Sequence, residues 1–219
     1  MQKNKGSCPL VDIMKGKLIL TFYVRLRFKK EGLVRFISHL DFTRSILRGL
    51  ARTGVPFVYT QGYSPRPRIS FGPPLSLGWE SETELMEIEV AEKADWMDLS
   101  RKVNENLPKG LNLAEVVFVN KKGMLNKEIK YIDYCIDLPK DFNKELLQKR
   151  LNIKFTGKRI ELSQDEKRSK NNPEKDYFIL KTEESVKMKD VLNEINESSG
   201  WFCVFVKRLA FYDKNENRI

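Results

Sequence analysis

The chain of 219 residues repeats one order of secondary-structure elements, and this repetition restricts its fold more than any other feature of the sequence. Apolar alternation and helical spacing predict the order strand, helix, strand, strand, helix, strand in each half. In the first half, strands are expected at 17–29, within 56–79, at 84–92 and at 111–119, and helices at 39–53 and 94–107. In the second half, strands are expected at 129–138, 153–162, 177–182 and 201–212, and helices at 141–151 and 185–199.

This repeated order is that of the split βαβ, or ferredoxin-like, unit. Two such units of about 100 residues each fit the length of the chain. We therefore predict an α+β protein made of two tandem ferredoxin-like (βαββαβ) subdomains, the first at residues 17–120 and the second at 128–219. Residues 1–16 are expected to form a flexible N-terminal segment. The boundary between the subdomains falls at 120–127, which is charged and lacks periodicity.

Apolar runs and cysteines exclude several classes of protein. No run approaches the roughly 18 apolar residues that span a bilayer, and the first residues lack the apolar stretch of a secretory signal, so we expect a cytoplasmic protein. Cys8, Cys135 and Cys203 are far apart and accompanied by one histidine, so their spacing predicts neither a disulfide framework nor a zinc site. Cys135 and Cys203 are expected to be buried and inert. No metal and no cofactor is predicted.

Positive charge is concentrated in residues 15–72, where twelve lysines and arginines stand against only Glu31 and Asp41. The net charge of this stretch is 12 − 2 = +10, which equals the formal charge of the whole protein. Residues 80–98 carry eight acidic residues and one lysine, a balance of −7. A concentrated basic region with aromatic residues among its arginines is typical of surfaces that bind RNA, through counterion release and stacking.

The first expected helix carries part of this basic region. Ser38 is a favourable N-cap with Asp41 three residues later, and Gly54 is a favourable residue for the helix end. At 100° per residue, three arginines share one face and apolar residues share the opposite face. These arginines are Arg44, Arg48 and Arg52. The pattern predicts a basic ridge, and the alternative is a solvated face on which Asp41 pairs with a neighbouring arginine.

The segment QGYSPRPRISFGPP at 61–74 follows this helix. Its prolines restrict the backbone, so little conformational entropy would be lost when Arg66 and Arg68 bind a ligand. The competing interpretation is a packed connection in which Tyr63, Ile69 and Phe71 belong to the core. The predicted RNA-binding residues are Arg35, Arg44, Arg48, Arg52, Tyr59, Tyr63, Arg66, Arg68 and Phe71.

His39 is the one histidine of the chain and is expected at the first helical position. The positive end of the helix dipole disfavours protonation of its imidazole there. A neutral imidazole could act as a general base towards a 2′-hydroxyl of bound RNA, or it could simply cap or pack. The glutamates of residues 80–89 favour an exposed strand that protects a sheet edge over a cation site.

Four stretches in residues 35–90 carry a family resemblance: FISHLD at 36–41, ARTG at 51–54, YTQGYSPRPR at 59–68 and SFGPPLSLGWESETE at 70–84. They resemble the F-I-S-H-L-D, R-R-A-G, Y-S-Q-G-F-N-P-H-P-K and S-F-x-x-P-L-x-x-G-x-x-S-x-x-E patterns of the radical-SAM-linked bacterial domain family. The resemblance implies a radical SAM protein as partner. The chain lacks the clustered cysteines of an iron–sulfur site, so it is not itself the radical enzyme.

The sequence therefore predicts a non-catalytic RNA-binding or substrate-presenting module that acts with a radical SAM protein. Two alternatives remain open. One is a metal-independent endoribonuclease that uses His39 as its base. The other is a docking domain that binds an acidic protein partner on the same basic surface, without nucleic acid.

Overall fold

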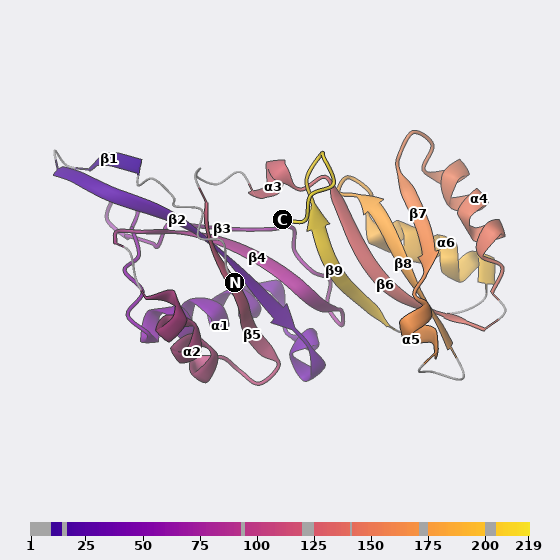
Figure 1. The fold of residues 1–219 in the computed structure, drawn as a ribbon, viewed down its shortest axis with the longest axis horizontal. Helices are drawn as coiled ribbons and strands as arrows, with labels where there is room; N and C mark the ends of the chain where they lie inside the picture. The colour runs from indigo at the N-terminus through magenta and orange to yellow at the C-terminus, as the bar shows by residue number, and fades with distance from the viewer. Residues whose placement is uncertain are drawn as a thin grey trace. The chain divides into compact units, whose positions relative to one another are not determined.

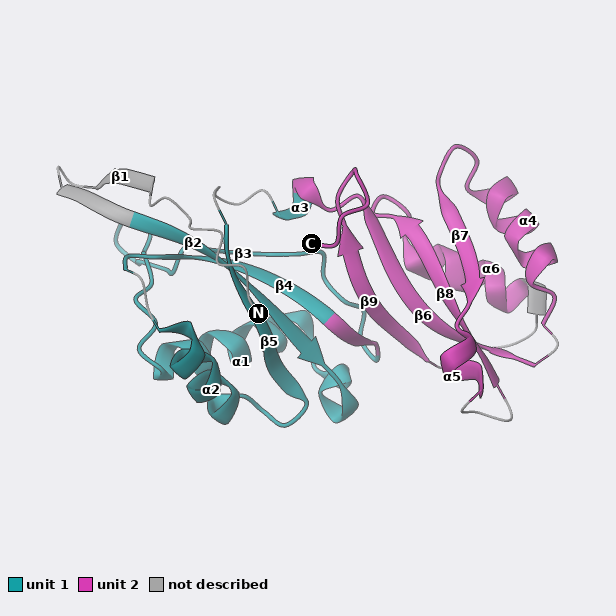
Figure 2. Ribbon diagram, in the orientation of Figure 1, with its two compact units in different colours: residues 1–78, 83–126 teal, residues 79–82, 127–219 magenta. Residues whose placement is uncertain are grey.

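The computed structural model describes residues 10–14, 17–92, 95–119, 125–140, 142–170, 175–199 and 205–219. It contains helices and strands throughout, so the protein is of mixed α+β class, as predicted. The chain divides into two compact units, shown in Figure 2. Unit 1 comprises residues 1–78 and 83–126, and unit 2 comprises residues 79–82 and 127–219.

Unit 1 consists of a sheet with two longer helices on one side (Figure 1). Strand β2 pairs antiparallel with β5 on one side and neighbours β4 on the other, and β3 pairs antiparallel with β4. The spatial order is therefore β5–β2–β4–β3, and β1 pairs with the start of β2. The elements are β1 (Leu10–Met14), β2 (Lys17–Lys30), a 3-10 helix η1 (Gly32–Phe36), α1 (His39–Arg52), β3 (Ile69–Phe71), β4 (Glu80–Val90), α2 (Trp96–Asn106), β5 (Leu111–Val119) and the short α3 (Leu125–Glu128), whose residues from 127 on fall in unit 2.

The core of unit 1 lies between the sheet and its helices. Alternate residues of β2, namely Val24, Leu26 and Phe28, are fully buried against apolar residues of α1 and α2. Because side chains of a strand alternate between its two faces, the residues between them belong to the opposite face of the sheet. Those residues include Arg25 and Arg27, so this opposite face carries charge.

Unit 2 is built in a similar way. Its antiparallel strands follow the spatial order β9–β6–β8–β7, and the first residues of β4 pair parallel with β9, Glu80 opposite Lys207. Helices α4 and α6 lie on one side of these strands (Figure 1). The elements are β6 (Tyr131–Pro139), α4 (Lys144–Lys154), β7 (Ile160–Gln164), α5 (Glu166–Lys170), β8 (Lys175–Glu183), α6 (Met188–Ser199) and β9 (Val206–Tyr212).

Three segments differ from the elements expected from the sequence. The segment expected to be flexible contains β1 over Leu10–Met14. The strand expected at 153–162 begins only at Ile160, because α4 continues to Lys154. Between β7 and β8 lies the short helix α5, which is not among the expected elements.

One cysteine and the helices can be compared with the expectations for buried thiols and for membrane-spanning segments. Cys135 is buried, as predicted, whereas Cys8 and Cys203 lie outside the described residues. Within the described part of the chain, no helix combines the length and the apolar character needed to cross a bilayer.

Candidate nucleic-acid interface

A side-chain cap fixes the start of α1 and thereby the position of the basic ridge. The backbone N–H of Asp41 donates to Oγ of Ser38 over 3.1 Å, and the same hydroxyl donates to Oδ2 of Asp41 over 2.8 Å. The helix therefore begins at His39, as the sequence predicts. Its apolar face then points into the core, where Phe42, Ile46 and Leu50 are buried.

The opposite face of α1 exposes its three arginines to solvent, as predicted from their spacing. Arg44 lies 3.7 Å from Oδ1 of Asp41, but both side chains are more than half exposed, and such surface pairs contribute only about 0–1 kcal/mol. Arg48 and Arg52 form no ion pair with any residue that the structure describes. The basic ridge is therefore available to an external anion.

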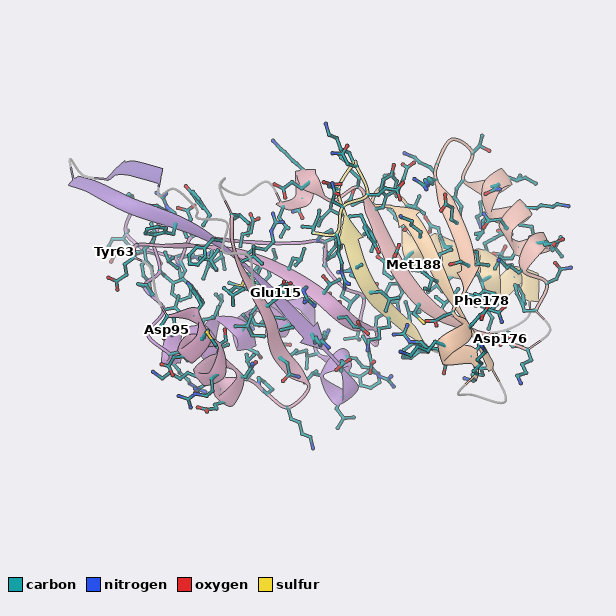
Figure 3. The ribbon with its side chains drawn as sticks, in the orientation of Figure 1. Tyr63, Asp95, Glu115, Asp176, Phe178 and Met188 are labelled. Atoms are coloured by element: carbon teal, nitrogen blue, oxygen red, sulfur yellow. The ribbon has the colours of Figure 1, made fainter. Side chains whose placement is uncertain are left out.

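The Pro-rich segment forms a hairpin that presents Tyr59, Tyr63 and Arg66. Tyr59 bridges to Pro67, and the backbone N–H of Thr60 donates to the carbonyl of Arg66 over 2.8 Å. Tyr63 at the tip is fully exposed, and Figure 3 shows its side chain at the margin of the ribbon. Tyr63 therefore does not belong to the core, and its ring is open to stacking.

Arg68, from the same segment, is already engaged within the protein. Its Nη1 lies 3.2 Å from Oε2 of Glu89, and its side chain is 22% exposed. Arg25 donates from Nε and Nη2 to Oε1 of Glu87 over 3.0 and 2.6 Å. Arg27 pairs with Glu115 over 2.9 Å. Three of the eight arginines in residues 15–72 are thus neutralised by glutamates of the same unit.

These pairs correct the expectation that the glutamate-rich strand is exposed and protects a sheet edge. Glu84, Glu87 and Glu89 are only 4–5% exposed, because β4 is an interior strand flanked by β2 and β3. On the sheet face opposite the helices, Glu87 pairs with Arg25 of β2, and Glu89 pairs with Arg68, which directly precedes β3. The sequence carried one signal for this: Arg25 and Arg27 alternate with core residues, so they belong to a face whose negative partners had to come from adjacent strands.

Three other predicted residues sit around the start of α1. The ring of Phe71 is half-buried against the core and lies edge-on to His39, with centroids 5.8 Å apart. The guanidinium of Arg35 stacks over the ring of Phe36 at 4.7 Å. His39 is exposed and also contacts Phe42. Among the described residues, no group of three or more His, Cys, Asp or Glu side chains is arranged to hold a metal ion.

A polar cluster in unit 2 was not anticipated. The hydroxyl of Tyr212 donates to Oδ2 of Asp133 over 2.8 Å, and Oδ1 of Asp133 is buried without a hydrogen-bond partner in the segments that the structure describes. Burial raises the pKa of Asp133 and, together with the hydrogen bond to Asp133, raises the pKa of Tyr212 to about 12. Both line a cavity of about 450 Å³. The alternation around Asp133 predicts a strand but gives no indication that Tyr212 is its partner.

Fold and surface together define a basic α+β protein with an arginine-lined helix face and an exposed aromatic hairpin. The chain belongs to the bacterial family described as "Uncharacterized protein conserved in bacteria (DUF2344)", whose profile matches residues 23–200. No curated protein is significantly similar to it. A solved structure, "Crystal Structure of an Unknown Protein from Galdieria sulphuraria", is similar over 82% of this chain and 94% of its own, at 10% identity and a TM-score of 0.28, too low to carry an inference.

Proposed function

We propose that this protein is a non-catalytic RNA-binding or substrate-presenting module that acts beside a radical SAM protein. The observation that carries the proposal is the set of exposed arginines, Arg48, Arg52 and Arg66, which form no ion pair within the described residues. Guanidinium groups in this state bind phosphates and release the counterions condensed on RNA. Tyr59 and Tyr63 add exposed rings on which unpaired bases can stack.

The proposed footprint is narrower than the one expected from the sequence alone. Arg68 would have to leave Glu89 to reach a phosphate, and Phe71 would have to leave the core to stack on a base. Both changes oppose binding. The footprint therefore comprises Arg35, Arg44, Arg48, Arg52, Tyr59, Tyr63 and Arg66.

We further propose that each unit has the ferredoxin-like fold. In a split βαβ arrangement, the two strands joined by a helix are separated by one inserted strand. In unit 1, β2 and β3 flank α1 in sequence and β4 lies between them. In unit 2, β6 and β7 flank α4 in sequence and β8 lies between them. The shared strand order supports the assignment of two tandem subdomains.

The RNA proposal is tested by measuring affinity for a structured RNA across a salt series, with the full chain and with Arg48→Ala and Arg52→Ala. Each substitution is expected to weaken binding and to reduce the salt slope by about one. Arg101→Ala is the matched control, because Arg101 is also exposed on a helix of unit 1 but pairs with Asp98 and Glu105. A negligible salt slope, or equal losses in all three variants, would overturn the proposal.

The radical SAM partner is proposed from the motifs in residues 36–84. Purification of the tagged full chain from its host before and after nuclease treatment tests it. Recovery of a radical SAM protein only without nuclease would indicate association through RNA. Recovery after nuclease would indicate direct docking, as expected for the acidic-partner alternative. Recovery in neither case would refute the partnership.

A further inference from the structure

A cavity of about 300 Å³ opens on the sheet face of unit 1 that lies opposite its helices. Its lining comes from β2, from the hairpin, and from the paired strands β3 and β4. The lining side chains used below are Tyr23, Thr60, Pro67, Ser70, Glu87 and Glu89. This volume lies at the lower end of the range for small-molecule pockets, about 300–1,000 Å³, and matches a single ring system better than a larger ligand.

Two residues of the cavity lining each carry a buried polar atom that has no hydrogen-bond partner among the described residues. Glu87 is 4% exposed; its Oε1 accepts from Arg25, whereas its Oε2 accepts from no group in the described part of the chain. Oγ of Ser70 is likewise buried and unpartnered. The two residues lie directly opposite each other in the antiparallel register of β3 and β4, so their side chains are neighbours. An unsatisfied carboxylate oxygen at this depth is costly, which makes a donor from a ligand favourable.

Charge balance defines the ligand further. The two carboxylates of the cavity, Glu87 and Glu89, are each paired with an arginine, so the site is close to neutral. An anion would meet the unpaired oxygen of Glu87, and a cation would lose its hydration without meeting net negative charge. A neutral group that offers an N–H donor beside a second polar atom suits both Oε2 of Glu87 and the hydroxyl of Ser70, which can donate or accept.

The walls of the cavity favour a flat ring. The aromatic residue Tyr23 and the cyclic residue Pro67 both line the cavity. An amino-substituted nucleobase combines such a ring with an N–H₂ donor next to a ring nitrogen. Uracil instead flanks its N–H with two carbonyl oxygens, which would face the carboxylate of Glu87.

The hairpin connects this cavity to the proposed interface. It carries Tyr59 and Arg66 on its exposed side and supplies Thr60 and Pro67 to the cavity wall. An RNA strand held at the hairpin would therefore have a base within reach of the cavity. We infer that the cavity binds one unpaired, amino-bearing nucleobase, with its amino group on Oε2 of Glu87 and its ring nitrogen on Ser70. This inference rests on the proposed RNA-binding function for the source of the base.

The test compares cytidine with uridine, which differ at this donor edge alone, by saturation-transfer NMR on the full chain. The same comparison with short oligo-C and oligo-U strands separates a free nucleoside from a base within a strand. Cytosine is expected to be preferred by about tenfold, the discrimination typical of one well-placed base contact. Equal binding of both bases in both formats, or no binding in either, would overturn the inference.

Two variants locate the site. Ser70→Ala removes an unpartnered hydroxyl, so the protein should fold normally while the preference for cytosine falls. Ser76→Ala, at an exposed serine of the same unit, is the control and should keep the preference. An unchanged preference in Ser70→Ala would refute the assignment to this cavity. Glu87→Gln is a second probe, provided that its circular dichroism shows a folded protein.

The outcomes also separate this inference from the proposed function. If oligo-U binds as tightly as oligo-C and with a steep salt slope, the basic interface is supported and the cavity site is refuted. If free cytidine is preferred over uridine while RNA binds weakly and independently of salt, the cavity site is supported and the basic interface is refuted. A preference seen only in the oligonucleotides would support a base delivered by a bound strand.

Discussion

Replacing Arg25 with methionine tests whether the ion pair with Glu87 holds the sheet of unit 1 together. The two side chains are 13% and 5% exposed, so water screens their interaction little. Without Arg25, the carboxylate of Glu87 would stay buried next to an apolar side chain. Removing one partner of a buried ion pair typically costs about 3–5 kcal/mol. Arg25→Met is therefore expected to lower the free energy of unfolding of unit 1 by about 3 kcal/mol.

Two further variants make this test specific. Arg27→Met changes the next arginine on the same face of β2, but its partner Glu115 is 47% exposed, so a loss of about 1 kcal/mol or less is expected. The double variant Arg25→Met, Glu87→Leu leaves no buried charge at the pair and is expected to recover most of the stability.

Urea denaturation provides the assay. Trp96 is buried in the core of unit 1, so its fluorescence follows this unit once Trp79 and Trp201 are replaced by phenylalanine. The unfolding free energies of the variants are compared by linear extrapolation. Equal losses for Arg25→Met and Arg27→Met, or no recovery in the double variant, would refute the reasoning that burial sets the strength of this pair.

Further predictions concern backbone strain, pH dependence and catalysis. Gly110→Ala should destabilise unit 1 by about 2 kcal/mol or more in thermal unfolding, because φ is +97° and the new Cβ would collide with a backbone carbonyl. Gly54→Ala is the control: its φ is +75° but its surroundings are open, so a loss of only about 1 kcal/mol is expected. Burial raises the pKa of Asp133 in the folded state, so its contribution to stability is present in acid and is lost as pH rises through that pKa. The free energy of unfolding of Asp133→Asn, measured by urea denaturation and taken relative to that of the wild type, should therefore be higher at neutral pH than at acidic pH. His39→Ala should leave RNA binding and any RNA cleavage in chelator unchanged on denaturing gels, and a loss of cleavage would establish the endoribonuclease alternative.

Local signals predicted the start and end of α1 well. Ser38 caps the helix through its own side chain, and Gly54 follows it with φ +75°, a conformation that favours glycine. Both features depend on contacts within a few residues. The start of the strand expected at 153–162 was wrong because Ile153, a β-branched residue in an apolar stretch, lies in the last turn of α4 with its side chain 77% exposed.

The side chains of the candidate interface could be placed from the sequence where helical periodicity determines their position. They could not be placed where strand pairing determines it. The spacing of Arg48 and Arg52 sufficed to place them on the solvent face of α1. The engagement of Arg68 by Glu89 requires the register of residues that are 21 positions apart. The unpartnered atoms of Ser70 and Glu87 likewise exist only because β3 and β4 pair in one particular register.

The strand β4 divides between the two units: its residues 80–82 belong to the second unit and its residues 83–90 to the first. Any gene truncation that separates the halves near residue 126 would strip β9 of its parallel neighbour at Glu80 and Ser81. The recombinant C-terminal fragment would then carry a bare sheet margin, prone to self-association. A biochemist wishing to study that half by itself should graft residues 79–82 back on through a linker.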